Sequence, residues 1–201
     1  MKNVTFHLIM DPTKTEFKAA LEIYEYSFPK NEKQSQETLI NRLTSGQERL
    51  IIGKIKEDVI AIAFLFDLLN TNFLVLDYFA ISEKLRGKGF GSYFFKHLND
   101  TAQSQSKNLL MEVDHPSFGT EIDKRRVMFY EKNGAKILNG IPYILPPLDD
   151  TLPTRQVLMS MNQKTELTKK EKQNLVENLY QQLYFRKIGD YFLDQILENI
   201  C

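Results

Sequence analysis

The sequence predicts an α/β fold: a mixed, mostly antiparallel sheet flanked by helices, with further helices at the C-terminal end. Three observations lead to it. β-rich runs alternate with amphipathic stretches up to residue 162. The early runs follow one another through short turns, as antiparallel strands do, whereas helical stretches separate the later ones, as crossovers require. Residues 164–201 are helical in pattern, so we expect a domain over 1–162 and a helical extension over 163–201 packed on it.

The first half of the chain begins with a strand, two helices and three strands. Thr13 and Glu16 form a predicted capping box for the first helix, and Gly46 is expected to stop the second. The charged pair Glu57-Asp58 between two β-rich runs indicates a hairpin. The expected elements are a strand at 4–10, helices at 14–28 and 37–46, and strands at 47–56, 59–66 and 73–81.

The second half alternates helices with strands and ends in the helical extension. Gly134 is expected to end one helix, and Thr168 with Glu171 predicts a capping box at the start of the extension. Gly189 is expected to break the extension into two helices. The expected elements are a helix at 90–106, a strand at 108–114, a helix at 120–133, and closing strands at 135–145 and 155–162.

Composition excludes several classes of protein. Lys plus Arg and Asp plus Glu both number 26, so the basic excess typical of nucleic-acid binders is absent and no nucleic-acid partner is expected. The one cysteine, Cys201, excludes an internal disulfide, and the three histidines show no metal-ligand spacing, so no metal site is expected. The polar N-terminus and the lack of a long apolar run favour a cytoplasmic protein without a membrane partner.

A glycine-rich stretch, Arg86-Gly87-Lys88-Gly89-Phe90-Gly91-Ser92, stands between the strand at 73–81 and the helix at 90–106. The start of a helix leaves backbone N–H groups unpaired at the positive end of the helix dipole, and glycines let an anion approach them closely. Arg86 and Lys88 add positive charge. The spacing fits neither the P-loop nor the dinucleotide fingerprint. The stretch therefore predicts either a phosphate or pyrophosphate site, or a flexible connector whose glycines serve the turn alone.

Two segments resemble the GNAT acyltransferases. Arg86-Gly87-Lys88-Gly89-Phe90-Gly91 is similar to motif A of that family, [Arg/Gln]-x-x-Gly-x-[Gly/Ala], and RVMFYEKNGAKI at 126–137 is similar to motif B. The order of elements is also similar, and the resemblance covers roughly residues 1–162. It implies a sheet splayed between two parallel strands, here 73–81 and 108–114.

The resemblance implies a site for acetyl-CoA as cosubstrate, with no metal. The amides of residues 86–92 would hold the pyrophosphate, and the edge of the strand at 79–81 would pair with the pantetheine amides. The implied reaction moves the acetyl group to a primary amine by direct attack in a ternary complex. The cofactor-binding residues expected on this basis are Phe79, Ala80, Ile81, Arg86, Gly87, Lys88, Gly89, Phe90, Gly91 and Ser92.

Acid–base residues are predicted on a helix and on a strand. Tyr130 lies in motif B, where the family often carries the tyrosine that protonates the CoA thiolate; the alternative is a core-facing tyrosine. Glu112 is the first candidate for the general base. Asp77 and Asp114 are further carboxylates expected at the acceptor side, and His115 is another possible proton acceptor. A carboxylate at a strand end is, however, more often solvated or paired with a cation.

One departure from the family falls in motif B. The family often carries Asn and Ala seven and four residues before the tyrosine, where this chain has Asp123 and Arg126. The run Lys124-Arg125-Arg126 predicts either a solvated helix face or positive charge near the 3′-phosphate of CoA.

The acceptor side is expected between the first two helices. Glu25, Tyr26 and Phe28 can shape a pocket for a cationic amine, small or peptidic, although a helix end with a mobile loop fits equally well. Two other functions stay open: a non-catalytic acyl-CoA-binding sensor and an interaction module. The chain is expected to be a monomer or a homodimer, and the extension packs on its own subunit, forms a dimer or covers the acceptor cleft.

Overall fold

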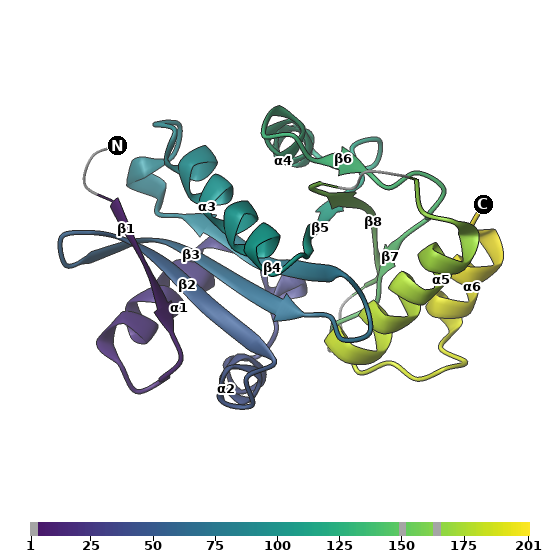
Figure 1. Cartoon of the computed structure of the whole chain (residues 1–201), viewed down its shortest axis with the longest axis horizontal. Helices are drawn as coiled ribbons and strands as arrows, with labels where there is room; N and C mark the ends of the chain where they lie inside the picture. Colours follow the sequence, from purple (N-terminus) through teal and green to yellow (C-terminus); the bar gives the residue numbers. More distant parts are fainter. Residues whose placement is uncertain (1–3, 149–151, 163–165) are drawn as a thin grey trace. The chain divides into compact units, whose positions relative to one another are not determined.

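The computed structural model describes residues 4–148, 152–162 and 166–201, and within them it is an α/β structure (Figure 1). The chain forms two compact units, one of residues 1–67 with 76–100, the other of 68–75 with 101–201. The elements are β1 (Val4–Ile9), α1 (Thr15–Ser27), α2 (Gln36–Thr44), β2 (Glu48–Ile55), β3 (Asp58–Asp67), β4 (Phe73–Ile81), α3 (Phe90–Ser104), β5 (Asn108–Asp114), α4 (Glu121–Lys132), β6 (Lys136–Ile137), β7 (Ile144–Leu145), β8 (Thr154–Ser160), α5 (Lys169–Asn178), a π-helical turn η3 (Leu179–Leu183) and α6 (Tyr191–Asn199).

The first unit is built on the strand order β1-β2-β3-β4, with β1, β2 and β3 antiparallel and side by side in Figure 1. The β2–β3 hairpin turns through Lys56 and Glu57, because Ile55 pairs with Asp58. The predicted turn at Glu57-Asp58 is therefore one residue too late, and the backbone of Lys56 takes the left-handed conformation (φ +54°) that such a short turn requires.

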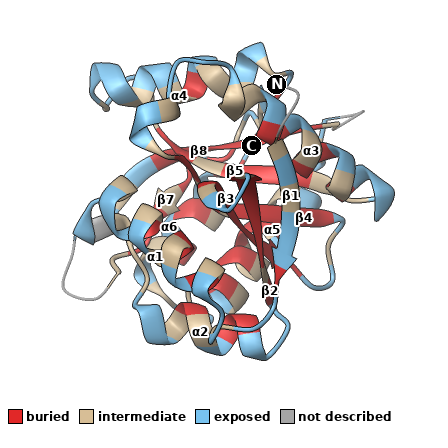
Figure 2. Cartoon of the chain, turned by 90° about the vertical axis from the view of Figure 1, so that its left-hand side faces the viewer, coloured by how far each residue is buried: buried red, intermediate tan, exposed pale blue. Residues whose placement is uncertain are grey.

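Alternation along β4 sends its side chains to two helical layers. Tyr78 and Ala80 belong to a core shared with α1 and α2, where Phe17, Tyr24 and Leu39 are also buried. Phe79 points the other way, and its ring lies 5.6 Å from Phe94 and 6.1 Å from Phe95 of α3. Figure 2 shows β2, β3 and β4 as mostly buried, whereas the edge strand β1 and the outer faces of α1 and α2 are exposed.

The start of α1 differs from the prediction. Lys14 is the N-cap and has no capping side-chain bond, while Asp11 accepts hydrogen bonds from the amide (2.9 Å) and hydroxyl (2.7 Å) of Thr13. The predicted Thr13–Glu16 capping box is wrong because Thr13 already serves an aspartate-centred turn that ends before the helix. The second helix begins as a capped helix should, with Ser35 accepting from the Thr38 amide.

The second unit holds the rest of the sheet. β4 and β5 are parallel over Phe73–Val75, β5 is antiparallel to β8, and β6 and β7 each pair with β8. The predicted strand at 135–145 is reduced to the two-residue strands β6 and β7, since Gly140 (φ +78°) and the residues around it turn the chain between them. Gly134 (φ +95°) ends α4 as predicted.

The C-terminal extension is helical, as predicted, and it lies in the second unit. Thr168 and Glu171 form the predicted capping box of α5, and Gly189 (φ +87°) precedes α6 as the predicted break. Its expected first residues, 163–165, lie outside the described residues. The division of the chain at 162 and 163 therefore stays a prediction.

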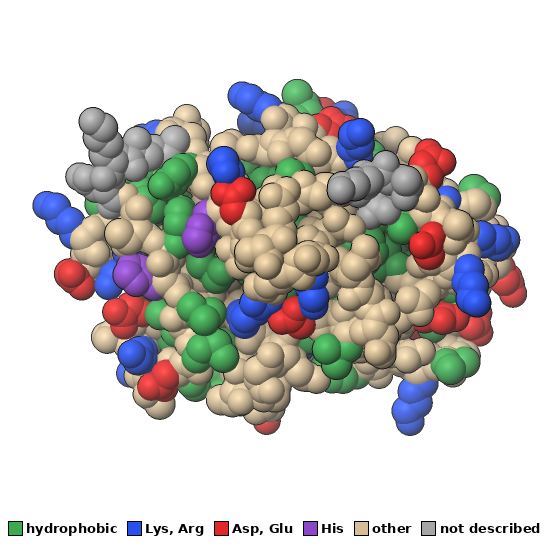
Figure 3. Space-filling model, viewed as in Figure 1, with side chains coloured by type: hydrophobic (Ala, Val, Ile, Leu, Met, Phe, Trp, Pro, Cys, Tyr) green, Lys and Arg blue, Asp and Glu red, His purple; other side chains and the backbone are tan. Residues whose placement is uncertain are grey.

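Two general features of the described residues concern the apolar character of the helices and the distribution of charge. No helix among them combines the length and the apolar character that crossing a membrane requires. On the face drawn in Figure 3, acidic and basic side chains are interspersed rather than gathered by sign.

Candidate active site

The glycine-rich stretch joins the end of β4 to the start of α3 within the first unit. Gly87 (φ +73°) and Gly89 (φ +83°) both have left-handed backbones, which L-residues rarely adopt. A Cβ built at Gly87 would meet no atom within 4 Å, so its backbone conformation rather than crowding calls for glycine there. Because α3 begins at Phe90, its first-turn amides lack intrahelical acceptors. The stretch thus places the main-chain donors of a helix start directly after an exposed loop, residues 86–89, with open space at Gly87.

The two basic residues of this stretch hold the shape of the loop. Arg86 Nε donates to the carbonyl of Ile81 (3.0 Å), and its Nη2 donates to Ser27 Oγ (3.3 Å). Lys88 Nζ donates to the carbonyl of Lys84 (2.9 Å). Lys88 therefore braces the turn from within, whereas Arg86 also ties it to the end of α1.

The last three residues of β4 have packed or buried side chains, so a ligand at this place would meet their backbone groups. Phe79 packs on α3, while Ala80 and Ile81 are buried. In the described part of the chain, the β4–β5 register runs only from Phe73 to Val75. The Ile81 carbonyl already accepts a hydrogen bond from Arg86, so a bound ligand would have to compete with Arg86 for it.

Tyr130 lies in the last turns of α4, in the second unit. Burial raises the pKa of Tyr130 to about 12, against the opposing influence of the Arg126 charge, so the phenol stays protonated at neutral pH. Its carbonyl accepts from the amides of Asn133 (3.1 Å) and Ala135 (3.0 Å), which fixes the end of the helix. Tyr130 is therefore a proton-bearing group on a well-anchored backbone.

Glu112 of β5 is held by two phenols. The hydroxyl of Tyr184 donates to Glu112 Oε2 (2.5 Å), and the hydroxyl of Tyr143 donates to Oε1. Burial and the charge of Glu112 raise the pKa of Tyr143 well above its usual value, so this phenol remains a donor. The carboxylate is thus oriented from both sides by neutral groups.

Asp114, two residues along β5, has a cationic partner instead. Arg126 Nη1 lies 2.8 Å from Asp114 Oδ2 and 3.7 Å from Asp123 Oδ1. Burial raises the pKa of Asp114 although Arg126 opposes the shift. Asp123 also accepts from the amide (2.6 Å) and hydroxyl (2.7 Å) of Thr120 at the start of α4. Asp123 and Arg126, the two positions at which motif B departs from the family, therefore form one ion-pair network with β5.

Asp77 of β4 belongs to a buried cluster in the first unit. Arg42 Nη1 lies 3.2 Å from Asp77 Oδ2, and the two side chains are 2% and 7% exposed. The guanidinium of Arg42 lies over the ring of Phe66 (5.4 Å). The neighbouring Glu48 is fully buried, and burial raises the pKa of both carboxyls, more than Arg42 lowers them.

The residues predicted for the acceptor side lie at and after the end of α1. Glu25 pairs with Lys33 and accepts from Gln36 (3.1 Å). Tyr26 is 70% exposed, and its hydroxyl donates to Glu83 (2.7 Å). Phe28 packs on the rings of Tyr24 (5.5 Å) and Tyr78 (5.0 Å), next to the core. Tyr26 is therefore the most accessible of the three predicted residues.

His115, the other predicted proton acceptor, follows β5 directly. Its Nδ1 accepts from the amide of Ser117 (3.2 Å), and its ring lies 4.9 Å from that of Phe118. The imidazole thus helps to shape the loop before α4.

Sequence reasoning missed the partners of these carboxylates. Tyr143 and Tyr184 are distant in sequence from Glu112, and Arg42 and Glu48 from Asp77. The spacing of Tyr180 and Tyr184 in an apolar helical stretch indicated that both side chains would be buried, but it does not predict which groups their hydroxyls contact. Among the described residues, no group of three or more His, Cys, Asp or Glu side chains is placed to hold a metal ion.

Comparison with solved structures decides the fold. A GNAT-family protein from Bacteroides thetaiotaomicron superimposes with a TM-score of 0.77 at 22% identity, covering 91% of this chain and 99% of that one. The chain has the GNAT acetyltransferase fold. The splayed-sheet fold predicted from the GNAT resemblance is thereby confirmed in its class, with β4 and β5 as the parallel pair. The sequence itself matches no protein-family model and no curated protein.

Two further GNAT structures cover a smaller share of the chain. A GNAT acetyltransferase from Elizabethkingia anophelis with acetyl-CoA bound has a TM-score of 0.56 at 17% identity and covers 80% of this chain and 99% of its own. The ribosomal-protein-S18-alanine N-acetyltransferase of Escherichia coli has a TM-score of 0.57 at 18% identity and covers 79% and 92%. Since 91% of 201 residues is about 183, the Bacteroides match includes part of residues 163–201.

Proposed function

We propose that this protein is an N-acetyltransferase that moves an acetyl group from acetyl-CoA to a primary amine in a ternary complex. The observation that carries the proposal is the junction between β4 and α3, where two left-handed glycines precede the free amides of a helix start on a GNAT fold. A relative of the same fold has been seen with acetyl-CoA bound.

The residues at this junction fit the cosubstrate. The amides of residues 87–92 would hold the diphosphate, with Arg86 and Lys88 beside them, because exposed main-chain donors and open space at Gly87 suit an oxyanion. The backbone of Phe79 and Ala80 would pair with the pantetheine amides, while the Ile81 carbonyl is already used by Arg86.

The chemistry falls to Glu112 and Tyr130. Acetyl-CoA supplies an activated thioester: a C–N bond to the acceptor forms and the C–S bond breaks. The amine must lose a proton, and we assign Glu112 as the base that accepts it, directly or through a water molecule. The departing thiolate gains a proton, and we assign Tyr130 as its donor, because the raised pKa of this phenol keeps it protonated at neutral pH.

For the acceptor we propose the surface around Glu25, Tyr26 and Phe28, of which Glu25 and Tyr26 are exposed and Tyr26 is the more accessible. Asp77 and Asp114 form ion pairs with Arg42 and Arg126 in this structure. Either carboxylate would bind the acceptor amine only by exchanging its arginine for it. The alternative function is a non-catalytic acyl-CoA sensor, which would need the same glycine loop but neither proton transfer.

Two matched glycine variants test the proposal. Gly87→Glu and Gly46→Glu impose the same backbone strain, because both glycines have left-handed φ values (+73° and +75°) and open space at the Cβ position. Only Gly87→Glu puts negative charge at the predicted diphosphate site. In calorimetry we expect it to abolish CoA binding while Gly46→Glu binds as wild type; equal binding by both variants would refute the cradle. Thiol release from acetyl-CoA with a panel of amines then separates an enzyme from a sensor.

A further inference from the structure

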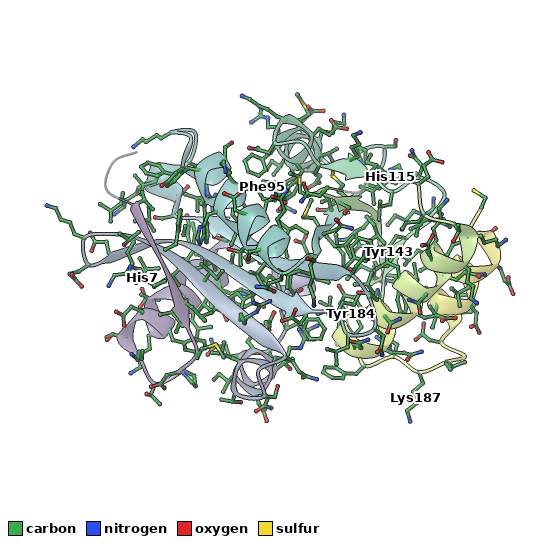
Figure 4. All side chains as sticks on the ribbon, in the orientation of Figure 1. His7, Phe95, His115, Tyr143, Tyr184 and Lys187 are labelled. Atoms are coloured by element: carbon green, nitrogen blue, oxygen red, sulfur yellow. The ribbon has the colours of Figure 1, made fainter. Side chains whose placement is uncertain are left out.

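The C-terminal extension reaches the strand that carries the proposed base. Tyr184 follows η3 and donates its hydroxyl to Glu112 Oε2 (2.5 Å), while Tyr143 bonds Oε1 from the chain before β7. Figure 4 labels both tyrosines, Tyr143 near β7 and β8 and Tyr184 within the extension, near α5. Both oxygens of one carboxylate are thus held by phenols from two separate segments.

The backbone of the extension is bent to bring Tyr184 to this place. Helix α5 passes into the π-helical turn η3, and the amide of Arg186 reaches back to the carbonyl of Tyr180 (2.8 Å). Phe185, directly after Tyr184, has a left-handed backbone (φ +53°), which is strained for an aromatic residue. Single π-helical turns and strained residues of this kind concentrate at functional sites.

Several contacts keep this turn in place on the rest of the second unit. Gln182 Nε2 donates to the carbonyl of Leu69 (3.0 Å), and its Oε1 accepts from the Leu69 amide (2.9 Å). Tyr180 donates to the carbonyl of Ile144, and Arg186 Nη2 donates to that of Pro147 (2.5 Å). The side chains that surround Tyr184 in sequence are therefore anchored independently of Glu112.

The character of the two donors matters for chemistry. A phenol donates to an ionised carboxylate more strongly than to a protonated one, so two phenols favour the form of Glu112 that can take up a proton. Among the described residues, titratable groups near this site include Tyr180, which adjoins Tyr143 and Tyr184 (ring centroids 6.2 Å from each), and Arg186 and Asp190, which influence Tyr180. Asp114 follows Glu112 by two residues on β5 and is paired with Arg126. Tyr180 is itself buried and protonated, with its pKa raised mainly by that burial.

We propose that the C-terminal extension is a working part of the site: Tyr184, together with Tyr143, is a positioning residue that keeps the Glu112 carboxylate oriented and ionised for the acceptor amine. This proposal rests on the proposed function of Glu112 as proton acceptor. It makes the extension a source of site residues rather than an appendage.

The test compares three tyrosine-to-phenylalanine variants of the full-length chain. Tyr184→Phe and Tyr143→Phe each remove one donor to Glu112 and keep the ring. Tyr180→Phe is the matched control, because it loses a buried hydroxyl bond in the same segment to a carbonyl instead. In kcat/KM against pH for a reactive amine, the acidic limb should move to higher pH by about one unit in the first two variants, and not in the control.

A second measurement does not depend on turnover. In ¹³C NMR, the Glu112 δ-carboxyl resonance, assigned by its loss in Glu112→Gln, should titrate at higher pH in Tyr184→Phe and Tyr143→Phe than in wild type and Tyr180→Phe. Unchanged titration and an unchanged acidic limb in both variants would overturn the positioning role, and Tyr143→Phe decides if Tyr184→Phe does not fold. If Glu112→Gln keeps full activity, the proposed base fails, while the NMR titration still decides the phenol contacts.

Discussion

Arg126 of α4 lies 2.8 Å from Asp114 of β5 and so ties the helix that carries Tyr130 to the strand that carries Glu112. The Asp114 side chain is 12% exposed, whereas 38% of the Arg126 side chain is exposed. The pair is therefore a half-buried link, in which loss of the cation leaves a carboxylate facing a poorly solvated site.

The first prediction concerns the stability of this link. Arg126→Ala should lower the free energy of unfolding by about 1 kcal/mol, less than a fully buried pair because of the exposed arginine. Urea titration at pH 7 measures it. The control is Lys124→Ala, which removes an exposed pair with Glu121 (2.7 Å) and should change stability by no more than about 0.5 kcal/mol. Equal effects of the two variants would contradict the prediction.

The same residue tests a hypothesis drawn from the basic run. Because Asp114 and Asp123 already compensate the charge of Arg126, we expect it not to bind the 3′-phosphate of CoA. The ratio of the affinities for CoA and 3′-dephospho-CoA should then be the same in Arg126→Ala and wild type. A ratio that falls several-fold in the variant would show that Arg126 does contact this phosphate.

Tyr130→Phe tests the proposed proton donor. Removing the hydroxyl should lower kcat about 10²-fold with little change in KM for acetyl-CoA, since general acid catalysis contributes mainly in the transition state. Steady-state kinetics of thiol release measures both constants. Phe129→Leu, a neighbouring change on the same helix, should leave kcat within a few-fold. A Tyr130→Phe enzyme with wild-type kcat would remove Tyr130 from the chemistry.

The buried Glu48 predicts a particular dependence of stability on pH. Its folded pKa is raised by burial and by Asp77, so its contribution to stability is fully present below its unfolded pKa and is lost as pH rises through the folded value. The free energy of unfolding of Glu48→Gln should therefore exceed that of wild type by on the order of 1 kcal/mol at neutral and alkaline pH. This difference should be smaller at pH 4, where Glu48 is protonated in the folded wild type. Urea unfolding from pH 4 to 9 measures the difference; the exposed Glu22→Gln is the control. A constant difference across this range would refute the assignment.

Two glycines of the second unit separate backbone strain from crowding. Gly140 and Gly189 both have positive φ values (+78° and +87°), but a Cβ at Gly140 would lie 2.6 Å from the backbone oxygen of Cys201, while Gly189 has open space. Gly189→Ala should cost about 1 kcal/mol in unfolding free energy, and Gly140→Ala about 1–3 kcal/mol more. Thermal and urea unfolding measure both, and equal losses would show that the chain near Gly140 yields freely.

Local signals in the sequence predicted much of this fold. The strand at Phe73–Ile81 has the predicted bounds, and the capping box at Thr168 and the helix end at Gly134 are where expected, because each is decided within a few residues. The Thr13 box failed since Asp11 competes for the same hydroxyl. The glycine loop was likewise visible from local chemistry alone. The contacts of Glu112 with Tyr143 and Tyr184 were not, because they join segments that only tertiary folding brings together.

The π-helical turn at Leu179–Leu183 has a consequence for how this chain can vary. Each residue of a helix turns the next by about 100°, so deleting one residue there would rotate Tyr184 to another side of the helix axis. Gln182 and Arg186 would lose their carbonyl partners in the same step. The length of this segment is therefore expected to be far less tolerant of insertions and deletions than its amino-acid identity.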